Sequence, residues 1–346
     1  MRYGLRFCAL SLVALVVGVS PGCNSGSGKP KVAIITNCIA EFWSICEAGA
    51  KKGSADFGVD VVFIQPNSNT VSDQTEKIND VLKLGVTGIA VSVIDPKEQT
   101  PNLKRIAAEK HFLAMDNDAP DSGRLCYIGI DNYEAGKAVG RMVKEAMPNG
   151  GTLVMFIGSM SSDNAANRVG GVLDELAGQK GAKGPTYGQF TLYSNAPLID
   201  ETKEDKAQEN AKDVLEKLKD AQNVVMVGLY AYNPKAILQA ARAKGVVGKV
   251  KIVGFDEDWV TLEGIAKGEI VGTVVQDPFQ YGYKSVEVLA ALAKGDKSKA
   301  TTSPIPYRKV TKDGGPEETI NGTKVVNLKV ADFKAKLEAD IASGKK

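Results

Sequence analysis

The chain has 346 residues, of which 43% are hydrophobic and 24% are charged. This content suffices for packed cores in about two domains of ordinary size, so it excludes disordered and fibrous classes of protein. The 43 basic and 41 acidic side chains leave a formal net charge of +2. Without a large field of either sign there is no electrostatic case for nucleic acid, and we expect a small, roughly neutral partner.

The first 23 residues have the pattern of an export leader. Two arginines precede an apolar run over residues 7–19, which ends in small residues and Cys23. That run is too short to span a bilayer as a helix, whereas a basic start, a short apolar stretch and a small-residue exit match a secretory signal.

Residues 20–23 read Ser-Pro-Gly-Cys and resemble a bacterial lipoprotein cleavage site, whose cysteine receives the lipid. We therefore expect residues 1–23 to be a lipoprotein-type signal peptide, Cys23 to be lipidated and residues 24–30 to form a flexible tether. This predicts a periplasmic or cell-surface protein that meets the membrane only through its lipid anchor. Plain secretion is the alternative, because Ser20 stands where such sites usually have leucine.

Short β-branched runs alternate with amphipathic stretches along most of the remaining chain. We expect strands over residues 31–36, 61–65, 88–92, 111–115, 125–130, 152–157, 189–193, 224–228, 250–255 and 272–276. We expect helices over residues 42–58, 73–84, 99–110, 133–147, 164–177, 204–219 and 233–244. This alternation predicts an α/β fold with parallel sheets covered on both faces. About ten strands are too many for one simple sheet, so two doubly wound lobes fit better.

The end of the chain has a different pattern. Residues 304–310 and 324–328 predict an edge hairpin with a polar, glycine-rich loop between them, and residues 330–343 predict a closing helix.

Cys38, Cys46 and Cys126 are the cysteines that remain once the leader and its lipid site are set aside. If Cys38 and Cys46 border one helix, they lie ~12 Å apart, beyond the ~7 Å limit for a disulfide. We expect all three to be small buried residues. The single His111 begins a predicted strand, so no well-placed base exists for a serine or cysteine nucleophile.

Polar and aromatic side chains follow most of the predicted strands. In open parallel sheets, ligands bind in the crevice beyond the carboxyl ends of the strands. Carboxylates, amides and a guanidinium match the hydroxyl groups of a sugar ring, and aromatic rings stack on its C–H faces. The side chains to inspect are Asn37, Phe42, Trp43, Ser92, residues 116–118, 131–132 and 159–168, Tyr230, Asp256 and Gln276.

Several stretches together resemble one known family. They are residues 31–36 followed by Glu-Phe-Trp at 41–43, then 113–116, 127–136, 167–171, 252–256 and 272–276. In this order and spacing they resemble a periplasmic solute-binding protein of the ribose- and galactose-binding type, the receptor of a bacterial ABC importer. The resemblance covers the chain from about residue 31 to about residue 307.

The resemblance implies a role for each matching residue. Phe42 and Trp43 would stack on a monosaccharide-like ring, and its hydroxyl groups would be bound by Asp116, Asn132, Arg168, Asp256 and Gln276. Asn37, Ser92 and Tyr230 are further candidates. The receptor would be a monomer that delivers its ligand to an ABC permease or, alternatively, docks on a sensor. It would need no cofactor, no metal and no nucleic acid.

The resemblance also implies two lobes. The chain would cross between them near Asp131, Gln276 and Ile305, and these crossings would form a three-strand hinge. The N-terminal lobe would comprise residues 31–131 plus 277–304, and the C-terminal lobe residues 132–276 plus 305–346.

Three departures from the family pattern affect the predicted ligand. Ala40-Glu41 replaces the family's Asn-Pro, Asn117 replaces its arginine, and Tyr230-Ala231 replaces its Asn-Asp. Because hydrogen-bonding pockets discriminate by specific hydroxyl groups, these changes leave the fold prediction intact and leave the identity of the sugar open.

Alternatives remain for several of these residues. Asp116 and Asp256 could cap turns or helices, Phe42 and Trp43 could be core residues, and Gln276 and Asn132 could bond hinge backbone. The carboxylates of Asp-Asn-Asp at 116–118 and Asp-Glu-Asp at 256–258 could bind a hard cation or act as a carboxylate pair in a secreted glycoside hydrolase. We favour binding without catalysis.

Overall fold

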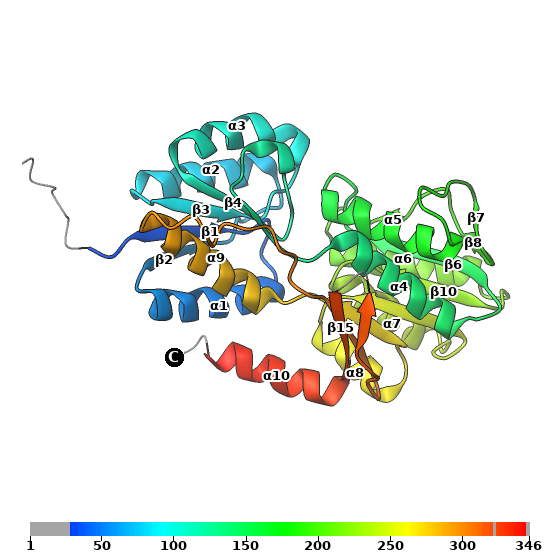
Figure 1. The fold of residues 1–346 in the computed structure, drawn as a ribbon. Coiled ribbons are helices and arrows are strands. Elements are labelled where there is room, and N and C mark those ends of the chain that lie inside the picture. The colour runs from blue at the N-terminus through cyan, green and yellow to red at the C-terminus, as the bar shows by residue number, and fades with distance from the viewer. Residues whose placement is uncertain (1–27, 321–322, 344–346) are drawn as a thin grey trace, which may run out of the picture.

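The computed structural model describes residues 28–320 and 323–343 (Figure 1). In this part of the chain, strands and helices alternate to build two α/β units, each around its own sheet. The prediction of two lobes with parallel sheets is confirmed. The predicted signal peptide at 1–23, the lipidation site Cys23 and the tether up to residue 27 lie outside the described residues.

The first unit is built on a fully parallel sheet of order β2-β1-β3-β4-β5. Its strands are β1 (Lys31–Ile35), β2 (Asp60–Ile64), β3 (Gly88–Val91), β4 (His111–Met115) and β5 (Tyr127–Ile128). Its helices are α1 (Glu41–Phe57), α2 (Val71–Lys83), α3 (Pro96–Glu109) and α9 (Pro278–Ala293), with a short 3-10 turn, η1, at Pro120–Ser122. Alternate residues of β1 face opposite layers, since Val32 packs with α1 and α9 while Ala33 packs with α2 and α3.

The second unit is built on a larger sheet of order β14-β15-β13-β12-β11-β10-β6-β8-β7, with β9 paired to β6. Its strands are β6 (Gly151–Ile157), β7 (Thr186–Tyr187), β8 (Phe190–Leu192), β9 (Leu198–Ile199), β10 (Val224–Gly228), β11 (Val250–Phe255), β12 (Gly272–Val275), β13 (Arg308–Thr311), β14 (Glu318–Ile320) and β15 (Thr323–Lys329). Its helices are α4 (Asn132–Ala146), α5 (Asp163–Ala177), α6 (Glu204–Lys217), α7 (Tyr232–Ala243), α8 (Trp259–Lys267) and α10 (Val330–Ser343).

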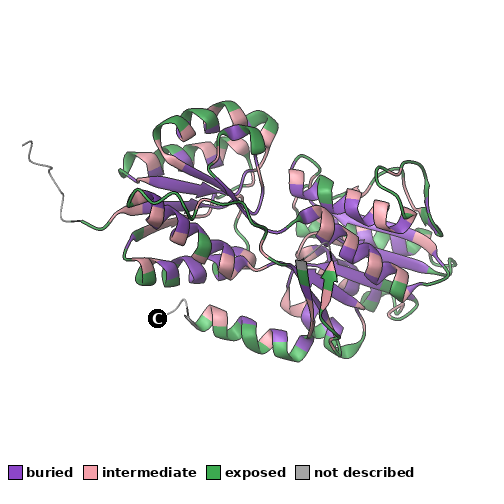
Figure 2. Cartoon of the chain, viewed as in Figure 1, coloured by how far each residue is buried: buried purple, intermediate pink, exposed green. Residues whose placement is uncertain are grey.

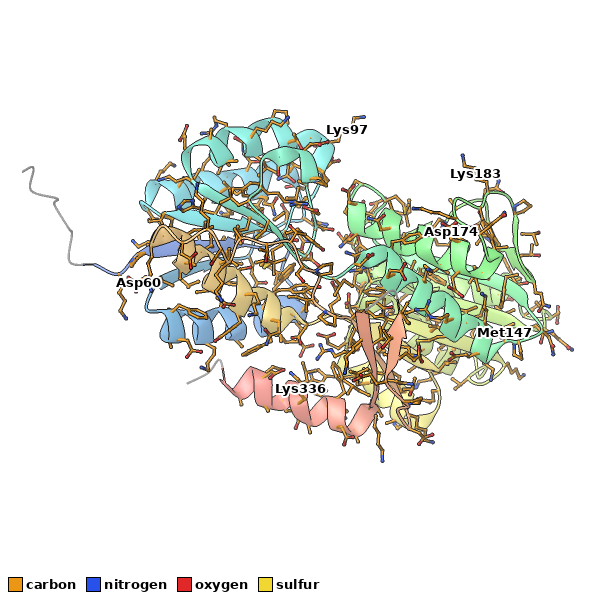
Figure 3. The ribbon with its side chains drawn as sticks, viewed as in Figure 1. Asp60, Lys97, Met147, Asp174, Lys183 and Lys336 are labelled. Carbon is orange, nitrogen blue, oxygen red and sulfur yellow. The ribbon has the colours of Figure 1, made fainter. Side chains whose placement is uncertain are left out.

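The central strands of this sheet run parallel and are covered on both faces. Residues of β6 and β10 alternate between a layer with α4 and α5 and a layer with α6, α7 and α8. The central strands of both units are buried, whereas the edge strands β2 and β14 and the outward helix faces are partly or fully exposed (Figure 2). Lys97 and Lys183 lie at the outer edges of the two units, in keeping with a dispersed surface charge (Figure 3).

The predicted edge hairpin between residues 304–310 and 324–328 is wrong. β13 pairs antiparallel with β12 but parallel with β15, and the hairpin is formed instead by β14 and β15. The chain first reverses into the short β14 at the sheet edge and then returns between β14 and β13. The three residues of β14 are too few to be read as a strand from the sequence, so this extra reversal was missed.

The chain passes between the two units at three places. It leaves the first sheet after β5 and enters α4, it leaves β12 for α9, and it returns to the second sheet at β13. The crossing segments contact one another: the Ile305 amide donates to the Gly129 carbonyl at 2.8 Å, and the Ile130 amide donates to the Tyr281 hydroxyl at 3.1 Å.

The last helix, α10, contacts both units. It packs against α1 of the first unit and against α8, β13 and β15 of the second (Figure 1). Phe333 and Leu337 of α10 share a hydrophobic cluster with Ile45 of α1. Among the described residues, none of the helices combines the length and the apolar composition that a membrane crossing requires.

Candidate functional site

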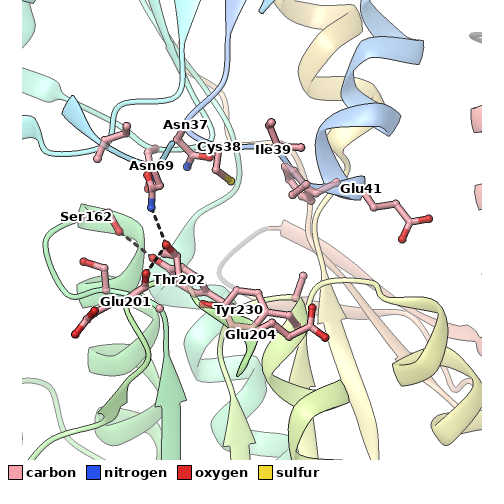
Figure 4. Close-up of a pocket in the computed structure, with 18 of the residues that line it drawn as sticks. Asn37, Cys38, Ile39, Glu41, Asn69, Ser162, Glu201, Thr202, Glu204 and Tyr230 are labelled. Carbon is pink, nitrogen blue, oxygen red and sulfur yellow. Dashed lines mark hydrogen bonds between the residues drawn. The ribbon is translucent and has the colours of Figure 1, made fainter. Parts of the chain in front are cut away.

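A cleft lies between the two units, at the carboxyl ends of the parallel strands. It has two compartments. The inner cavity, of about 110 Å³, is lined by Asp116, Arg168, Asp256, Gln276, Trp43 and Asn164 together with residues shared with the outer chamber. The outer chamber, of about 670 Å³, opens toward loops of both units (Figure 4). The shared residues include Asn37, Cys38, Phe42, Asn117, Tyr230 and Tyr232, so the two compartments are continuous.

Asp116 follows β4 and is buried at the inner cavity. Its φ of 62° is left-handed, an unusual conformation for a residue other than glycine and one that is often found at functional sites. The Ser92 hydroxyl donates to its carboxylate at 2.8 Å, and the Tyr127 hydroxyl donates to its carbonyl at 2.7 Å. Burial raises the pKa of Asp116 to about 6, against the opposing charge of Arg168.

Asp256 occupies the matching position after β11 in the second unit, also with a left-handed φ of 63°. The side chain of Gln276 donates to its carboxylate at 2.7 Å. Burial raises the pKa of Asp256, while the Arg168 charge and the Gln276 hydrogen bond oppose that rise. Neither Asp116 nor Asp256 caps a helix. Asp258 caps α8 instead, by accepting from the amides of Val260 and Thr261.

Arg168 lies on α5 and is 2% exposed. Its Nε donates to Asn132 Oδ1 at 2.9 Å, and its Nη1 donates to the Leu229 carbonyl at 3.0 Å. Nη1 also lies 3.7 Å from Asp256 Oδ2. The guanidinium stacks on Phe255, with its carbon 3.9 Å from the ring centroid. A buried cation needs such partners, and here they orient it before any ligand arrives.

Gln276 connects the inner cavity to the crossing segments. Its amide nitrogen binds Asp256, and its amide oxygen accepts from the Tyr281 hydroxyl at 2.8 Å. The Tyr281 hydroxyl in turn accepts a hydrogen bond from the Ile130 amide in the first crossing segment. A carboxylate at the site is therefore joined to the hinge through two side chains.

Aromatic rings line the cleft from both units. Phe42 lines both compartments and packs edge-on against Trp43, with ring centroids 4.8 Å apart. Trp43 belongs to the core, lines the inner cavity and donates to Asn37 Oδ1 at 3.1 Å. Tyr230 from the second unit lines both compartments opposite them.

Two of the predicted site residues lie behind the cavity wall. Ser92 and Asn132 are buried and absent from the lining of both compartments in the described part of the chain. Ser92 holds the Asp116 carboxylate, and Asn132 holds the Arg168 guanidinium. They position the Asp116 and Arg168 side chains. The other predicted residues line the cleft directly: Asn37, Phe42, Trp43, Asp116, Arg168, Tyr230, Asp256 and Gln276.

Several cleft residues are not among those predicted to bind the ligand. Asn117 and Tyr232 line both compartments, and Asn164 lines the inner one. The departures from the family pattern at Asn117 and at Tyr230-Ala231 were the available signal, because each falls directly after a strand of the site. Cys38 also lines both compartments, and burial raises the pKa of its thiol to about 11. Cys46 and Cys126 are buried and free, as expected.

The carboxylates of residues 116–118 do not cluster at one point, and neither do those of residues 256–258. In the first, Asp118 pairs with Arg124 while Asp116 faces the inner cavity. In the second, Asp258 caps α8, Asp256 faces the inner cavity and Glu257 lines the outer chamber. Across residues 28–320 and 323–343, no three side chains of histidine, cysteine, aspartate or glutamate come together in a way that could hold a metal ion.

Two α/β units joined by three crossing segments, with polar and aromatic groups facing each other across a cleft, define a two-lobed solute-binding protein. The particular family follows from comparison with known proteins. The model of the periplasmic binding protein domain matches residues 32–297, and the chain belongs to that family.

Known relatives cover most of the chain. The ribose import binding protein of Salmonella typhimurium is 25% identical over 84% of this chain and 93% of its own length. The D-xylose-binding periplasmic protein of Escherichia coli is 25% identical over 70% of this chain and 71% of its own length. An ABC transporter solute-binding protein from Burkholderia graminis, solved with D-arabinose, superposes with a TM-score of 0.76 at 25% identity, covering 83% of this chain and 96% of that one.

Proposed function

We propose that the protein is the extracytoplasmic receptor of an ABC importer and that it encloses a monosaccharide-like ring between its two lobes. The observation that carries the proposal is the inner cavity, where Asp116 of one unit faces Arg168 and Asp256 of the other. Relatives named for ribose and xylose, and a structure holding D-arabinose, support a sugar as the ligand class.

The chemistry of the inner cavity suits an uncharged ring with several hydroxyl groups. A hydrogen bond to a charged group contributes about 1.5–3 kcal/mol, and aromatic stacking adds about 0.5–1.5 kcal/mol. Ordering and desolvation offset part of this gain. With two carboxylates, one guanidinium and the rings of Phe42, Trp43 and Tyr230 in place, micromolar or tighter affinity is expected.

The two lobes would close over the ligand by rotation about a hinge. We propose residues 31–131 plus 277–304 as the N-terminal lobe and residues 132–276 plus 305–346 as the C-terminal lobe, with the three crossing segments as the hinge. A ligand favours the closed form only through contacts that are absent when the lobes are apart. The Gln276–Tyr281–Ile130 hydrogen bonds give such contacts a direct connection to the hinge.

We further propose that the mature protein is a monomer anchored by a lipid on Cys23, with residues 24–30 as its tether. The leader pattern supports the anchor. Intact mass after membrane extraction tests the anchor, and a species without acyl chains would contradict it. Light scattering of the purified protein tests the monomer.

A panel of pentoses, hexoses, polyols and nucleosides, measured by thermal shift and calorimetry with product formation followed in parallel, tests the binding function. We expect at least one sugar to raise the melting temperature without being converted. Turnover without stabilisation would favour the hydrolase alternative. Failure of every carbohydrate to bind would contradict the proposal.

A further inference from the structure

Most of the cleft lies outside the inner cavity. The outer chamber of about 670 Å³ falls within the range of about 300–1,000 Å³ typical of pockets for drug-sized ligands, whereas the inner cavity of about 110 Å³ falls below it. The inner cavity can hold at most one sugar ring. Since Phe42, Asn117 and Tyr230 line both compartments, a ligand seated in the inner cavity can extend into the outer chamber without a break.

The outer chamber persists although the two units already touch. Asn69 of the first unit donates to Thr202 of the second at 3.3 Å, shown as a dashed line in Figure 4. Trp259 of the second unit donates to Glu41 of the first at 2.7 Å. These side-chain bonds span the cleft, so the chamber is not simply a gap between separated lobes.

The loop that carries Thr202 has a defined conformation that hydrogen bonds stabilise. Glu201 and Thr202 both have left-handed φ values, of 57° and 60°. Buried Asp200 holds the loop, because its carboxylate accepts from the Thr202 amide at 3.0 Å and from the Asn233 side chain at 2.8 Å. The Tyr232 hydroxyl also donates to it. A strained loop held by several bonds to one buried carboxylate gives the chamber a defined rim.

In the described part of the chain, the chamber lining offers no free cation, and most of its acidic side chains already have partners. Glu41 accepts from Trp259, Glu201 pairs with Lys203 and Lys206, and Glu204 and Asp258 pair with Lys235, so the chamber favours a neutral ligand over an anion. Of the described residues that line it, Lys235 is the one basic side chain, and Glu204 at 2.7 Å and Asp258 at 3.6 Å already pair with it. Burial and the neighbouring Asp256 carboxylate raise the pKa of Glu257, which favours its uncharged form. No unpaired cation among these lining residues is therefore available for a phosphate or carboxylate.

The chamber walls combine apolar and uncharged polar groups. Ile39 of the first unit is 67% exposed and Ile199 of the second is 42% exposed, and both line the chamber. Uncharged hydroxyl and amide groups lie beside them, from Ser68, Asn69, Ser159, Ser161 and Thr202. An apolar face with polar edges is the complement of a sugar ring.

Two buried oxygen atoms in the cleft lining have no hydrogen-bond partner among the described residues. Buried Asn117 lines both compartments, and its Oδ1 has no hydrogen-bond partner among the described residues. Glu257 Oε2 in the chamber wall likewise has none among them. An unpaired buried oxygen costs about 1–3 kcal/mol, which a ligand hydroxyl could relieve.

From these observations we infer that the outer chamber is a second sugar subsite and that the preferred ligand is a neutral disaccharide. One ring occupies the inner cavity and the other lies in the outer chamber. The glycosidic link passes between Phe42, Asn117 and Tyr230. This inference rests on the proposed sugar-binding function and extends its ligand by one ring.

Calorimetry on the purified protein tests the inference with matched sugars: glucose against maltose and cellobiose, galactose against lactose and melibiose, and xylose against xylobiose. We expect at least one disaccharide to bind at least tenfold more tightly than its component monosaccharide. If monosaccharides bind and every disaccharide binds no more tightly, the second subsite is refuted while the proposed function stands. If no carbohydrate binds, the proposed function itself fails.

A variant in the outer chamber gives a second test. Ser161 is exposed and lines the outer chamber but not the inner cavity. In Ser161→Trp, the added indole ring takes up part of the chamber, and we expect the ratio of disaccharide to monosaccharide affinity to fall at least tenfold. Ser161→Ala is the matched control and should keep the ratio within twofold. An unchanged ratio in the tryptophan variant would overturn the second subsite.

Discussion

The inner cavity and the outer chamber are adjacent parts of one cleft, yet they are built in opposite ways. In the inner cavity the three charged side chains are buried and already held by protein groups: Ser92 for Asp116, Gln276 for Asp256 and Asn132 for Arg168. In the outer chamber the groups are mostly uncharged and partly exposed, and its charged pairs lie near water.

This difference indicates which compartment supplies most of the affinity and which one selects the length of the ligand. Groups that are oriented before binding lose little entropy when a ligand arrives, so the inner cavity is expected to supply most of the affinity. Hydroxyl and amide groups near water supply less energy each. The outer chamber is therefore expected to select the length of the ligand more than to bind it.

Removal of the buried Arg168 guanidinium should have the largest effect on the free energy of unfolding and on sugar affinity. In Arg168→Ala the hydrogen bonds to Asn132 and Leu229 are lost, and buried Asp256 loses its nearest cation. Breaking a buried pair in this way costs about 3–5 kcal/mol, so we expect a lower free energy of unfolding in urea and at least a hundredfold weaker sugar binding in calorimetry.

Arg168→Lys keeps the charge but not the planar fork, and it should recover part of the stability and little of the affinity. Arg105→Ala, at an exposed arginine bonded to Asn102, is the control and should change neither quantity measurably. Wild-type affinity in Arg168→Ala would remove the inner cavity from the binding site.

Asp116→Asn should weaken binding but stabilise the empty protein. Burial raises the folded-state pKa of this carboxyl from its usual 3.8 to about 6, so keeping it ionised in the folded protein costs about 3 kcal/mol above pH 6. That cost disappears as the pH falls through 6 toward 4, because the folded form then binds the proton more readily than the unfolded chain.

We therefore expect Asp116→Asn to raise the melting temperature at pH 7.5, with a gain that shrinks as the pH approaches 4, and to weaken sugar binding at least tenfold. The matched control is Asp118→Asn, two residues away, whose carboxylate pairs with Arg124 outside the cleft lining. It should leave affinity unchanged. A loss of stability in Asp116→Asn at pH 7.5 would show that the carboxylate is not strained by burial.

A smaller effect is expected in the pH dependence of sugar affinity, which also depends on the Asp116 carboxylate. A sugar hydroxyl that donates to Asp116 requires the carboxylate, so wild-type affinity should fall by up to tenfold for each pH unit below about 6. Calorimetry from pH 7.5 to 5 measures this trend. Asp116→Asn should show a flatter profile, and a flat profile in the wild type would mean that Asp116 does not accept a ligand hydroxyl.

The smallest effect is expected at the rim of the outer chamber. Asn69→Ala removes one part-buried hydrogen bond to Thr202, which at 3.3 Å is long and so is worth about 0.5 kcal/mol, the low end for a neutral pair. Monosaccharide affinity should change by less than about threefold. A loss as large as that in Asp116→Asn would contradict the division of roles between the two compartments.

Some of the site followed directly from the sequence. Asp116, Asp256 and Gln276 each directly follow a buried strand, and the carboxyl ends of parallel strands meet at one edge. Position after a strand does not reveal where a side chain points. Ser92 and Asn132 also follow predicted strands, yet they lie behind the wall and hold Asp116 and Arg168 in place.

The end of the chain shows a second limit of prediction. The strand character of residues 308–311 and 323–329 was recognisable, but their parallel pairing depends on the three-residue β14. Helix α10 was also predicted, and its packing against α1 of the other unit was not. Both features depend on contacts between distant segments, for which local periodicity carries no signal.

The sequence by itself determined the alternation of strands and helices, the two-lobed α/β class and the set of polar groups at the strand ends. These follow from hydrophobic periodicity and residue chemistry, which act over a few neighbouring residues. The tertiary structure alone decided which carboxylates face the cleft, which residues brace them and how large the outer chamber is. Those properties depend on backbone direction at single residues, such as the left-handed φ of Asp116 and Asp256, and on the approach of two separate units.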